Sequence, residues 1–301
     1  DIDFDKLAFA SADLAGRPKG SYHHGGGGAG HIDLTASVDE VKATRIPGYL
    51  PHQVGEHTSA WLRKALLDGV AKNVRLTLKG DLDQFPFPAG KGGEFLVEAD
   101  VEKAKLLYQP GWPAIDDIDA KLTFHNEAMR VESTRASTVG VPLRQVRVGI
   151  DQLGATAPWL KIEGEIDDKL DRMLAFTTKS PVDGWLGGFT GKIRAAGPAA
   201  LKLQLAVPLA GEDSTKVRGD IDFKHNRLLF TQLPLPELTA VQGRLTFTER
   251  GIDSKGVAME AFGGAFRLSA HTGADKRMRF EVGGEADGKR VLQQYLAPLA
   301  P

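Results

Sequence analysis

Apolar and polar residues alternate with period two over most of this 301-residue chain, and this pattern constrains its fold more than any other feature. Residues 74–79 read Val-Arg-Leu-Thr-Leu-Lys, residues 120–124 read Ala-Lys-Leu-Thr-Phe, and residues 201–205 read Leu-Lys-Leu-Gln-Leu. Such segments form strands with one apolar and one polar face. Strands of a parallel sheet, buried on both faces, would read apolar throughout. The pattern therefore predicts an antiparallel meander.

Three short helical patterns interrupt the strands. We expect the first to be capped by Thr58 or Ser59 and stopped by Gly69. The second should begin near Asp167 and the third near Asp287. Three helices cannot cover so many apolar strand faces, so the sheet must close, fold on itself or curl into a groove. The predicted fold is mainly β: a long, curved antiparallel sheet that forms an apolar groove, with about three short helices at its edges or ends.

The helical patterns start about 110–120 residues apart, and short segments between them recur. Residues 105–108 (Lys-Leu-Leu-Tyr) correspond to 227–230 (Arg-Leu-Leu-Phe), and 121–124 (Lys-Leu-Thr-Phe) correspond to 244–247 (Arg-Leu-Thr-Phe). We predict one continuous elongated unit, 1–301, with internal repeats at approximately 57–165 and 166–286 and the start of a further unit at 287–301. Two unrelated hairpins with common strand residues remain the alternative.

The apolar residues of successive strands are expected to share one concave face. A shift of one residue in a strand turns every side chain to the opposite face, so the phase of each strand is a specific prediction. The candidate groove-lining residues are Leu76, Phe95, Val97, Leu122, Phe124, Val148, Leu203, Leu205, Phe247 and Phe280.

Composition argues against several classes of protein. Lys and Arg total 38 against 39 for Asp and Glu, whereas a nucleic-acid-binding protein needs a clustered positive surface. Zero cysteines exclude disulfides and thiolate chemistry. The glycine-rich run 25–30 precedes a strand pattern rather than the helix that a dinucleotide site requires. The histidines at 23–31 and the aspartates at 116–119 lack metal-ligand spacing. We expect no catalytic residues, no metal and no cofactor.

No apolar run reaches the ~18–20 residues of a membrane-spanning helix. The start of the chain reads as the middle of a strand rather than as a signal peptide. The chain therefore looks like a section of a longer protein. Trp61 and Trp185, beside the first two helical patterns, have two interpretations: a pair that binds a partner or a membrane interface, or aromatic lids over one end of the sheet.

Several motifs together resemble a known family. They are Tyr-Leu-Pro at 49–51, Trp-Leu at 61–62, Phe-Pro-Phe at 85–87 and Pro-Gly-Trp-Pro at 110–113. Their order and spacing are similar to those in the central region of the YhdP proteins, which belong to the AsmA-like superfamily of bridge-like lipid transfer proteins in Gram-negative bacteria.

The resemblance implies a function that the residues alone do not. Family members have an inner-membrane helix and a periplasmic body built as a repeating β-groove, and they are implicated in phospholipid transport and in the outer-membrane permeability barrier. This chain would be a periplasmic segment without the anchor, a non-enzymatic conduit whose partners are phospholipid acyl chains and, through the full-length parent, the inner and outer membranes. Nucleic acid is not an expected partner, and periplasmic or membrane protein partners stay unknown. The alternative is a structural or assembly scaffold for outer-membrane biogenesis without lipid cargo; an enzyme, such as a glycan-processing β protein, is a distant third.

Overall fold

The computed structural model describes residues 1–3, 9–10, 15–50, 54–185, 188–273, 275 and 277–296. Pro51 of the Tyr-Leu-Pro motif lies outside these ranges. The strands before the second helix are β1 (Ile2–Asp3), β2 (Phe9–Ala10), β3 (Ala15–His23), β4 (His31–Lys42), β5 (Leu66–Asp81), β6 (Gly93–Leu106), β7 (Ile115–His125), β8 (Ala128–Thr138), β9 (Val141–Ile150) and β10 (Trp159–Lys169). The later strands are β11 (Ile193–Ala196), β12 (Pro198–Pro208), β13 (Lys216–Phe230), β14 (Leu238–Thr248), β15 (Gly251–Ala261), β16 (Gly264–Thr272) and β17 (Met278–Gly284). The helices are α1 (Glu56–Ala65), α2 (Leu170–Thr178), α3 (Val182–Trp185) and α4 (Gly288–Leu296), with 3-10 turns η1 (Ala43–Gly48), η2 (Leu82–Gln84), η3 (Pro88–Gly90) and η4 (Thr190–Lys192).

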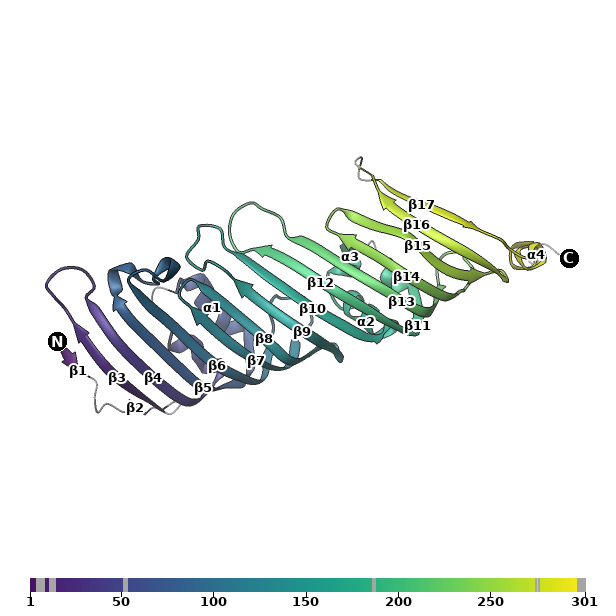
Figure 1. Cartoon of the computed structure of the whole chain (residues 1–301). Helices are drawn as coiled ribbons and strands as arrows, with labels where there is room; N and C mark the ends of the chain where they lie inside the picture. The colour runs from purple at the N-terminus through teal and green to yellow at the C-terminus, as the bar shows by residue number, and fades with distance from the viewer. Residues whose placement is uncertain are drawn as a thin grey trace.

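All 17 described strands belong to one antiparallel sheet, which extends along the whole length of the molecule (Figure 1). Neighbours in the sequence are neighbours in the sheet, because each strand from β3 to β10 hydrogen-bonds with the next. The meander continues from β10 to β12 and then through β13 to β17. β1 and β2 both pair with β3, and β11 and β12 both pair with β13. The predicted long antiparallel sheet is confirmed.

The helices and the main apolar clusters lie on one face of the sheet, which we call the inner face. In the first cluster Ile46 of η1 packs on Val41, Ala71 and Ala99. In the second, Leu170 and Met173 of α2 pack on Ala199 of β12. A third cluster joins Val241, Val257 and Met259 of β14 and β15. Figure 1 shows α1, α2 and α3 behind the sheet, so the opposite, outer face is turned toward the viewer.

The two long edges of the sheet differ because the connections alternate between them. One edge, the helix rim, carries the segments 43–50, 54–65, 107–114, 139–140, 170–185, 188–192, 231–237, 262–263 and 285–296. The other edge, the turn rim at the top of Figure 1, carries the segments 24–30, 82–92, 126–127, 151–158, 209–215 and 249–250, and residues 273, 275 and 277. Every helix named α therefore lies at one edge.

Backbone irregularities recur along the chain at the offset of the sequence similarity. Left-handed residues occur at Lys103 in β6 and His225 in β13, and again at Asp117 in β7 and Ala240 in β14. Each coincides with a register shift in its strand pair. A helix followed by six strands occurs twice, from α1 to β10 and from α2 to β17. In the second case β11 and β12 count as one strand, because both pair with β13. The division into repeats at 57–165 and 166–286 stays a proposal that these features support.

The predicted ends of the first helix are wrong. α1 begins at Glu56 after Gly55, and the Ser59 hydroxyl donates to the Val54 carbonyl instead of capping a backbone N–H. Gly69 lies inside β5 with φ +110°, where an added Cβ would be 2.4 Å from the Ala104 Cα. This glycine is required by a close strand contact, not by a helix end.

The other two helix starts were predicted more closely. α2 begins at Leu170, three residues after the predicted start near Asp167, because β10 continues through Lys169. α4 begins at Gly288, and the Asp287 carboxylate accepts a hydrogen bond from the Lys289 N–H at 2.9 Å. That bond satisfies one of the unpaired N–H groups at the helix N-terminus.

Candidate functional site

Strand register places all ten predicted groove residues on the inner face. Val97 lies opposite both Leu76 and Phe124. Val148 and Leu205 both lie opposite Ile162. Because residues directly opposite one another share a face, each such pair extends the face to the next strand.

The same reasoning carries the face to the last strands. Gly219 lies opposite both Leu203 and Phe247, and Phe247 lies opposite Ile252. Ala270 pairs with Ser254 on one side and with Phe280 on the other. Phe95 and Leu122 occupy the same phase as their neighbours in β6 and β7. The ten residues come from seven strands, and their contact with a ligand stays a prediction.

The inner face is almost free of charge. In the described strands from β3 to β17, no lysine, arginine or glutamate occupies an inward-facing position of the registered ladders. Asp168, at the end of β10, is the one inward-facing carboxylate of these ladders, and it pairs with Arg172 of α2 at 3.0 Å. Arg172 also donates to the Gly140 carbonyl in the β8–β9 turn. The charge is therefore neutralised at the helix rim, and the remaining face offers only apolar and small uncharged side chains.

The outer face has the opposite character. Cross-strand ion pairs cover it, including Lys79–Asp33, Lys72–Glu102, Arg135–Asp119, Lys202–Glu165, Lys224–Asp167 and Arg244–Asp222. Exposed pairs of this kind contribute little stability individually. They keep the outer face solvated, which explains why the polar phase of each strand is rich in charge.

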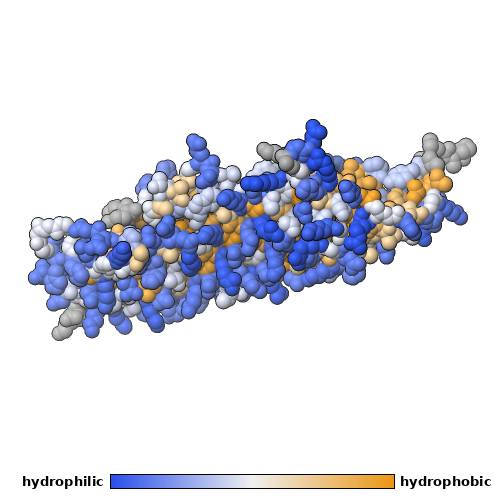
Figure 2. All heavy atoms as spheres, turned by 45° about the horizontal axis from the view of Figure 1, so that its top comes forward, coloured by the Kyte–Doolittle hydropathy of each residue, from blue (hydrophilic) through white to orange (hydrophobic). Residues whose placement is uncertain are grey.

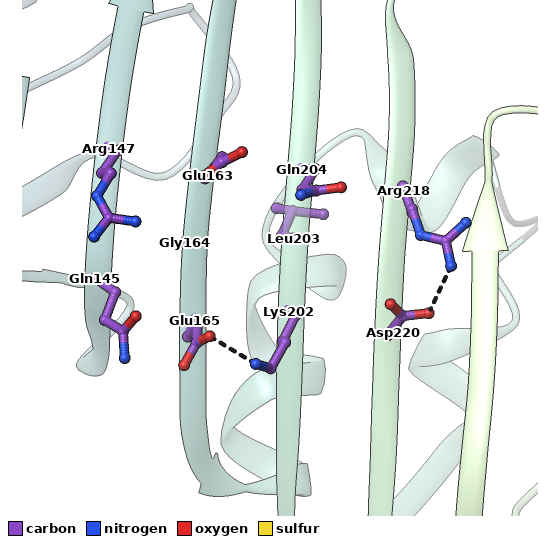
Figure 3. Close-up of a pocket in the computed structure, with 10 residues that line it drawn as sticks. All are labelled: Gln145, Arg147, Glu163, Gly164, Glu165, Lys202, Leu203, Gln204, Arg218 and Asp220. Atoms are coloured by element: carbon purple, nitrogen blue, oxygen red, sulfur yellow. Dashed lines mark ion pairs between the residues drawn. The ribbon is translucent and has the colours of Figure 1, made fainter. Parts of the chain in front are cut away.

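A shallow cavity of about 350 Å³ lies over β9, β10, β12 and β13 on this outer face (Figure 3). Its charged side chains are Arg147, Lys202 and Arg218 against Glu163, Glu165 and Asp220. Figure 3 shows four of these charges in two ion pairs, Lys202–Glu165 at 3.0 Å and Arg218–Asp220 at 3.7 Å. Three positive and three negative groups balance, so this hollow is a solvated part of the charged face and does not select for an apolar ligand.

Glycines and aromatic rings shape the inner face. The Phe247 ring lies over Gly219, where an added Cβ would be 2.0 Å from the ring's Cζ. Phe87, fully buried, covers Gly93 in the same way at 2.5 Å. The two rings occupy the space that a side chain at these glycines would fill.

Aromatic side chains join α1 and α2 into a wall along the helix rim. The Trp61 indole N–H donates to the Tyr108 carbonyl at 3.0 Å, which fastens α1 to the β6–β7 connection. Trp112, in that connection, contacts Phe176 of α2 at 6.1 Å and Trp185 of α3 at 5.6 Å between ring centroids. Burial raises the pKa of the Tyr108 phenol to about 12.

These contacts favour the second interpretation of Trp61 and Trp185. Both lie on the helix rim. Trp61 bonds the Tyr108 carbonyl, the Tyr108 ring contacts Trp112 at 5.8 Å, and Trp112 contacts Trp185, although Trp185 is still 72% exposed. The sequence pattern did not reveal the link, because Trp112 and Phe176 come from separate connections. Trp112 of the Pro-Gly-Trp-Pro motif is the centre of this cluster.

The second half of the helix rim is built in the same way. The Thr231 N–H donates to the Lys192 carbonyl at 2.9 Å, and Phe189 contacts Phe230 at 6.0 Å. The Tyr295 hydroxyl of α4 donates to the Pro234 carbonyl at 2.8 Å. The connections 107–114 and 231–237 therefore each fasten two successive helical segments.

At the turn rim, the Phe-Pro-Phe motif folds over the inner face. Phe85 contacts Phe87 and the predicted groove residue Phe95, with centroid distances of 5.9 and 5.2 Å. The Asp83 carboxylate accepts a hydrogen bond from the Ala29 N–H at 2.8 Å, which ties this loop to the neighbouring hairpin. The inner face is thus partly roofed at β5 and β6, from the rim opposite α1.

Figure 2 shows a band of hydrophobic side chains along the molecule between hydrophilic side chains on either side. The exposed large apolar residues at the C-terminal end include Met278, Phe280 and Val282 of β17, each more than half exposed. Within the described ranges, no group of three or more His, Asp or Glu side chains is placed to hold a metal ion. None of the described helices has both the length and the hydropathy needed to cross a membrane.

One long sheet with an inner face almost free of charge, a helical wall at one rim and a charged outer face defines a β-groove protein. The chain belongs to the YhdP family, because the family model described as "YhdP protein" matches residues 1–301. It is 24% identical over 225 residues to the protein named "Intermembrane phospholipid transporter YhdP" of Escherichia coli (strain K12). That match covers 74% of this chain and 17% of the relative. No solved structure matches the chain.

Proposed function

We propose that the chain is a section of a non-enzymatic conduit that carries phospholipids between membranes, with the acyl chains on the inner face. The observation that carries this proposal is the inner face of β3 to β17, which is continuous and carries one carboxylate, that of Asp168, paired with Arg172 at the helix rim. An apolar surface that extends over so many strands is unfavourable in contact with water unless an apolar ligand covers it. Acyl chains fit because they need no hydrogen-bond partners and no fixed register along the face.

The ten residues from Leu76 to Phe280 are proposed as lining residues of this conduit. Their side chains offer dispersion contacts and no polar anchor, so a lipid can move from strand to strand without breaking a specific bond. The relative's printed name supports phospholipid as the cargo. The family membership supports a role in the longer parent, which we propose to be anchored in the inner membrane, to place this segment in the periplasm, and to maintain the outer-membrane permeability barrier.

The test compares two adjacent residues of β12 that face opposite ways. Leu205→Asp places a carboxylate on the inner face, whereas Gln204→Asp places it on the outer face, between Glu163 and Arg218 of the neighbouring strands. An unpaired charge under an acyl chain loses its hydration at a cost of several kcal/mol. We expect Leu205→Asp to reduce phospholipid that co-purifies with the chain at least fivefold, measured by native mass spectrometry.

Gln204→Asp is the matched control and should leave bound phospholipid within about twofold of the parent chain. Both variants must first show the same circular dichroism and similar unfolding midpoints. If well-folded Leu205→Asp binds phospholipid normally, the proposed conduit is wrong for this segment. Repeated absence of phospholipid from the parent chain itself would favour the scaffold instead.

A further inference from the structure

The uncovered part of the inner face is a strip between the helical wall and the turn rim. On β12, Ala199 and Leu201 pack against α2, whereas Leu203, Leu205 and Val207 lie beyond that cluster. The four residue steps from Leu203 to Val207 span about 13 Å at ~3.3 Å per residue. On β5, Val74 packs in the η1 cluster and Leu76 lies beyond it, but the Phe85–Phe87 loop covers the positions nearer the turn rim, so the strip is open over its full width only in the second half.

The width of this strip matches the length of acyl chains lying along the strands. The hydrocarbon core of a bilayer is about 30 Å thick, so one leaflet of acyl chains is about 15 Å. A phospholipid that lay along the strands would therefore reach from the wall to the turn rim, with its polar head group at one of these two edges. The chemistry of the two edges differs.

The helix rim is suited to the ends of acyl chains. Six of the eight tryptophans and tyrosines lie there, namely Trp61, Trp112, Trp185, Tyr49, Tyr108 and Tyr295. The Trp61 and Tyr295 polar atoms donate to backbone carbonyls of the wall, at 3.0 and 2.8 Å. The charged pair of α1, Glu56 and Arg63, is 86% and 51% exposed and so faces water.

The turn rim of the second half is suited to head groups. Every residue of the connection 209–215 is exposed, Glu212 and Asp213 among them, and the turn 249–250 contains Glu249 and the 89% exposed Arg250. Trp159, at this rim, has the Lys216 ammonium 5.1 Å from its ring centroid. Charges of both signs in water cost a zwitterionic head group little desolvation, whereas acyl-chain ends placed here would be exposed to water.

We propose that between β9 and β14 phospholipids lie across the groove, along the strand direction, with acyl-chain ends against the helical wall and head groups at the turn rim. This orientation rests on the proposed function and adds to it the side from which head groups project. The Phe85–Phe87 loop roofs the turn rim at β5 and β6, so the unroofed second half is where head groups have free room. Lipids then move along the conduit side by side, with every head group at one edge.

The experiment uses two photoreactive phosphatidylcholines, one with a diazirine at the end of an acyl chain and one with a diazirine on the head group. Each is loaded onto the purified 301-residue chain, irradiated, and mapped by peptide mass spectrometry. The acyl-end probe should label segments 107–114 and 170–192 at least fivefold more than segments 209–215 and 249–250. The head-group probe should show the reverse preference.

The outcomes separate the orientation from the function. If both probes label both rims equally, or the preferences are exchanged, phospholipid binds but the orientation is wrong. If neither probe labels the chain above an unirradiated control, the proposed function fails and the orientation fails with it. The proposal is supported only if the acyl-end probe labels mainly the helix rim and the head-group probe labels mainly the turn rim.

Discussion

Gly219 and Gly164 provide a direct test of the register that creates the inner face. Both are inward-facing and both lie opposite Leu203. An added Cβ at Gly219 would be 2.0 Å from Cζ and 2.3 Å from Cε1 of Phe247, so the ring must move. An added Cβ at Gly164 would meet the Val146 Cγ2 at 3.5 Å and the Arg144 carbonyl oxygen at 4.0 Å, both ordinary contacts.

The structure gives opposite signs for the two alanine substitutions. Replacing a strand glycine by alanine at a compatible site stabilises a protein by about 0.4–1 kcal/mol, because the unfolded chain loses freedom. We expect this gain for Gly164→Ala. For Gly219→Ala, displacement of Phe247 costs about 1–3 kcal/mol as overpacking, which exceeds the gain. The two variants should therefore differ by about 1–3 kcal/mol in the free energy of unfolding.

The assay is urea denaturation followed by circular dichroism, with the slope checked for equality between variants. A second set of variants combines Phe247→Ala with Gly219→Ala and with Gly164→Ala. Without the ring, Gly219→Ala should become stabilising, by about the same amount as Gly164→Ala. If Gly219→Ala and Gly164→Ala have equal effects in the parent chain, Phe247 does not lie over Gly219, and the register from β12 to β14 is wrong.

Three further predictions concern stability and the rims. Asn226 is fully buried, and its side chain hydrogen-bonds three backbone groups at the junction of β11 and β12. Asn226→Ala should therefore lower the free energy of unfolding by about 3 kcal/mol, measured by urea titration. An unchanged unfolding midpoint would contradict these hydrogen bonds. The Arg244 guanidinium lowers the pKa of Asp222 through two 2.7 Å hydrogen bonds, so the stabilising contribution of this pair is present above pH ~4 and is lost as pH falls through the lowered pKa. Asp222→Asn should flatten the acid limb of the stability profile, and an identical acid limb would argue against the pair. Tyr295→Phe removes the hydrogen bond to Pro234, so hydrogen exchange of α4 should accelerate while exchange of α2 stays the same; equal rates in α4 would show that the bond does not hold the helix.

The phase of the strands was accessible from sequence because it depends only on alternation. Leu76, Val148 and Leu205 take their positions from period-two patterns, and the bulges do not disturb the phase where these residues lie. Turn residues and alternation together were sufficient for the order of the strands, since each hairpin joins neighbours. These are local properties, and they gave the sheet and the inner face.

The helix boundaries and the rims were not accessible in the same way. Gly69 has the sequence character of a helix stop, but its contact with Ala104 comes from the neighbouring strand, 35 positions away. Asn226 carries no sign in the sequence that it closes a strand junction. The wall depends on contacts of Trp112 with two helical segments, α2 and α3, that lie more than 60 residues further along the chain. Contacts between separate connections set these features, and a single sequence does not record them.

The central claim is that phospholipid occupies the inner face and not the outer one. The most direct measurement places a photoreactive benzoylphenylalanine at Leu203 in one form of the full-length parent and at Gln204 in another, and irradiates living cells. These neighbouring residues of β12 point to opposite faces, so each serves as the control of the other. The account predicts that phospholipid cross-links at 203 and not at 204. Equal cross-linking at the two positions, or none at 203 in a well-folded protein, would contradict it.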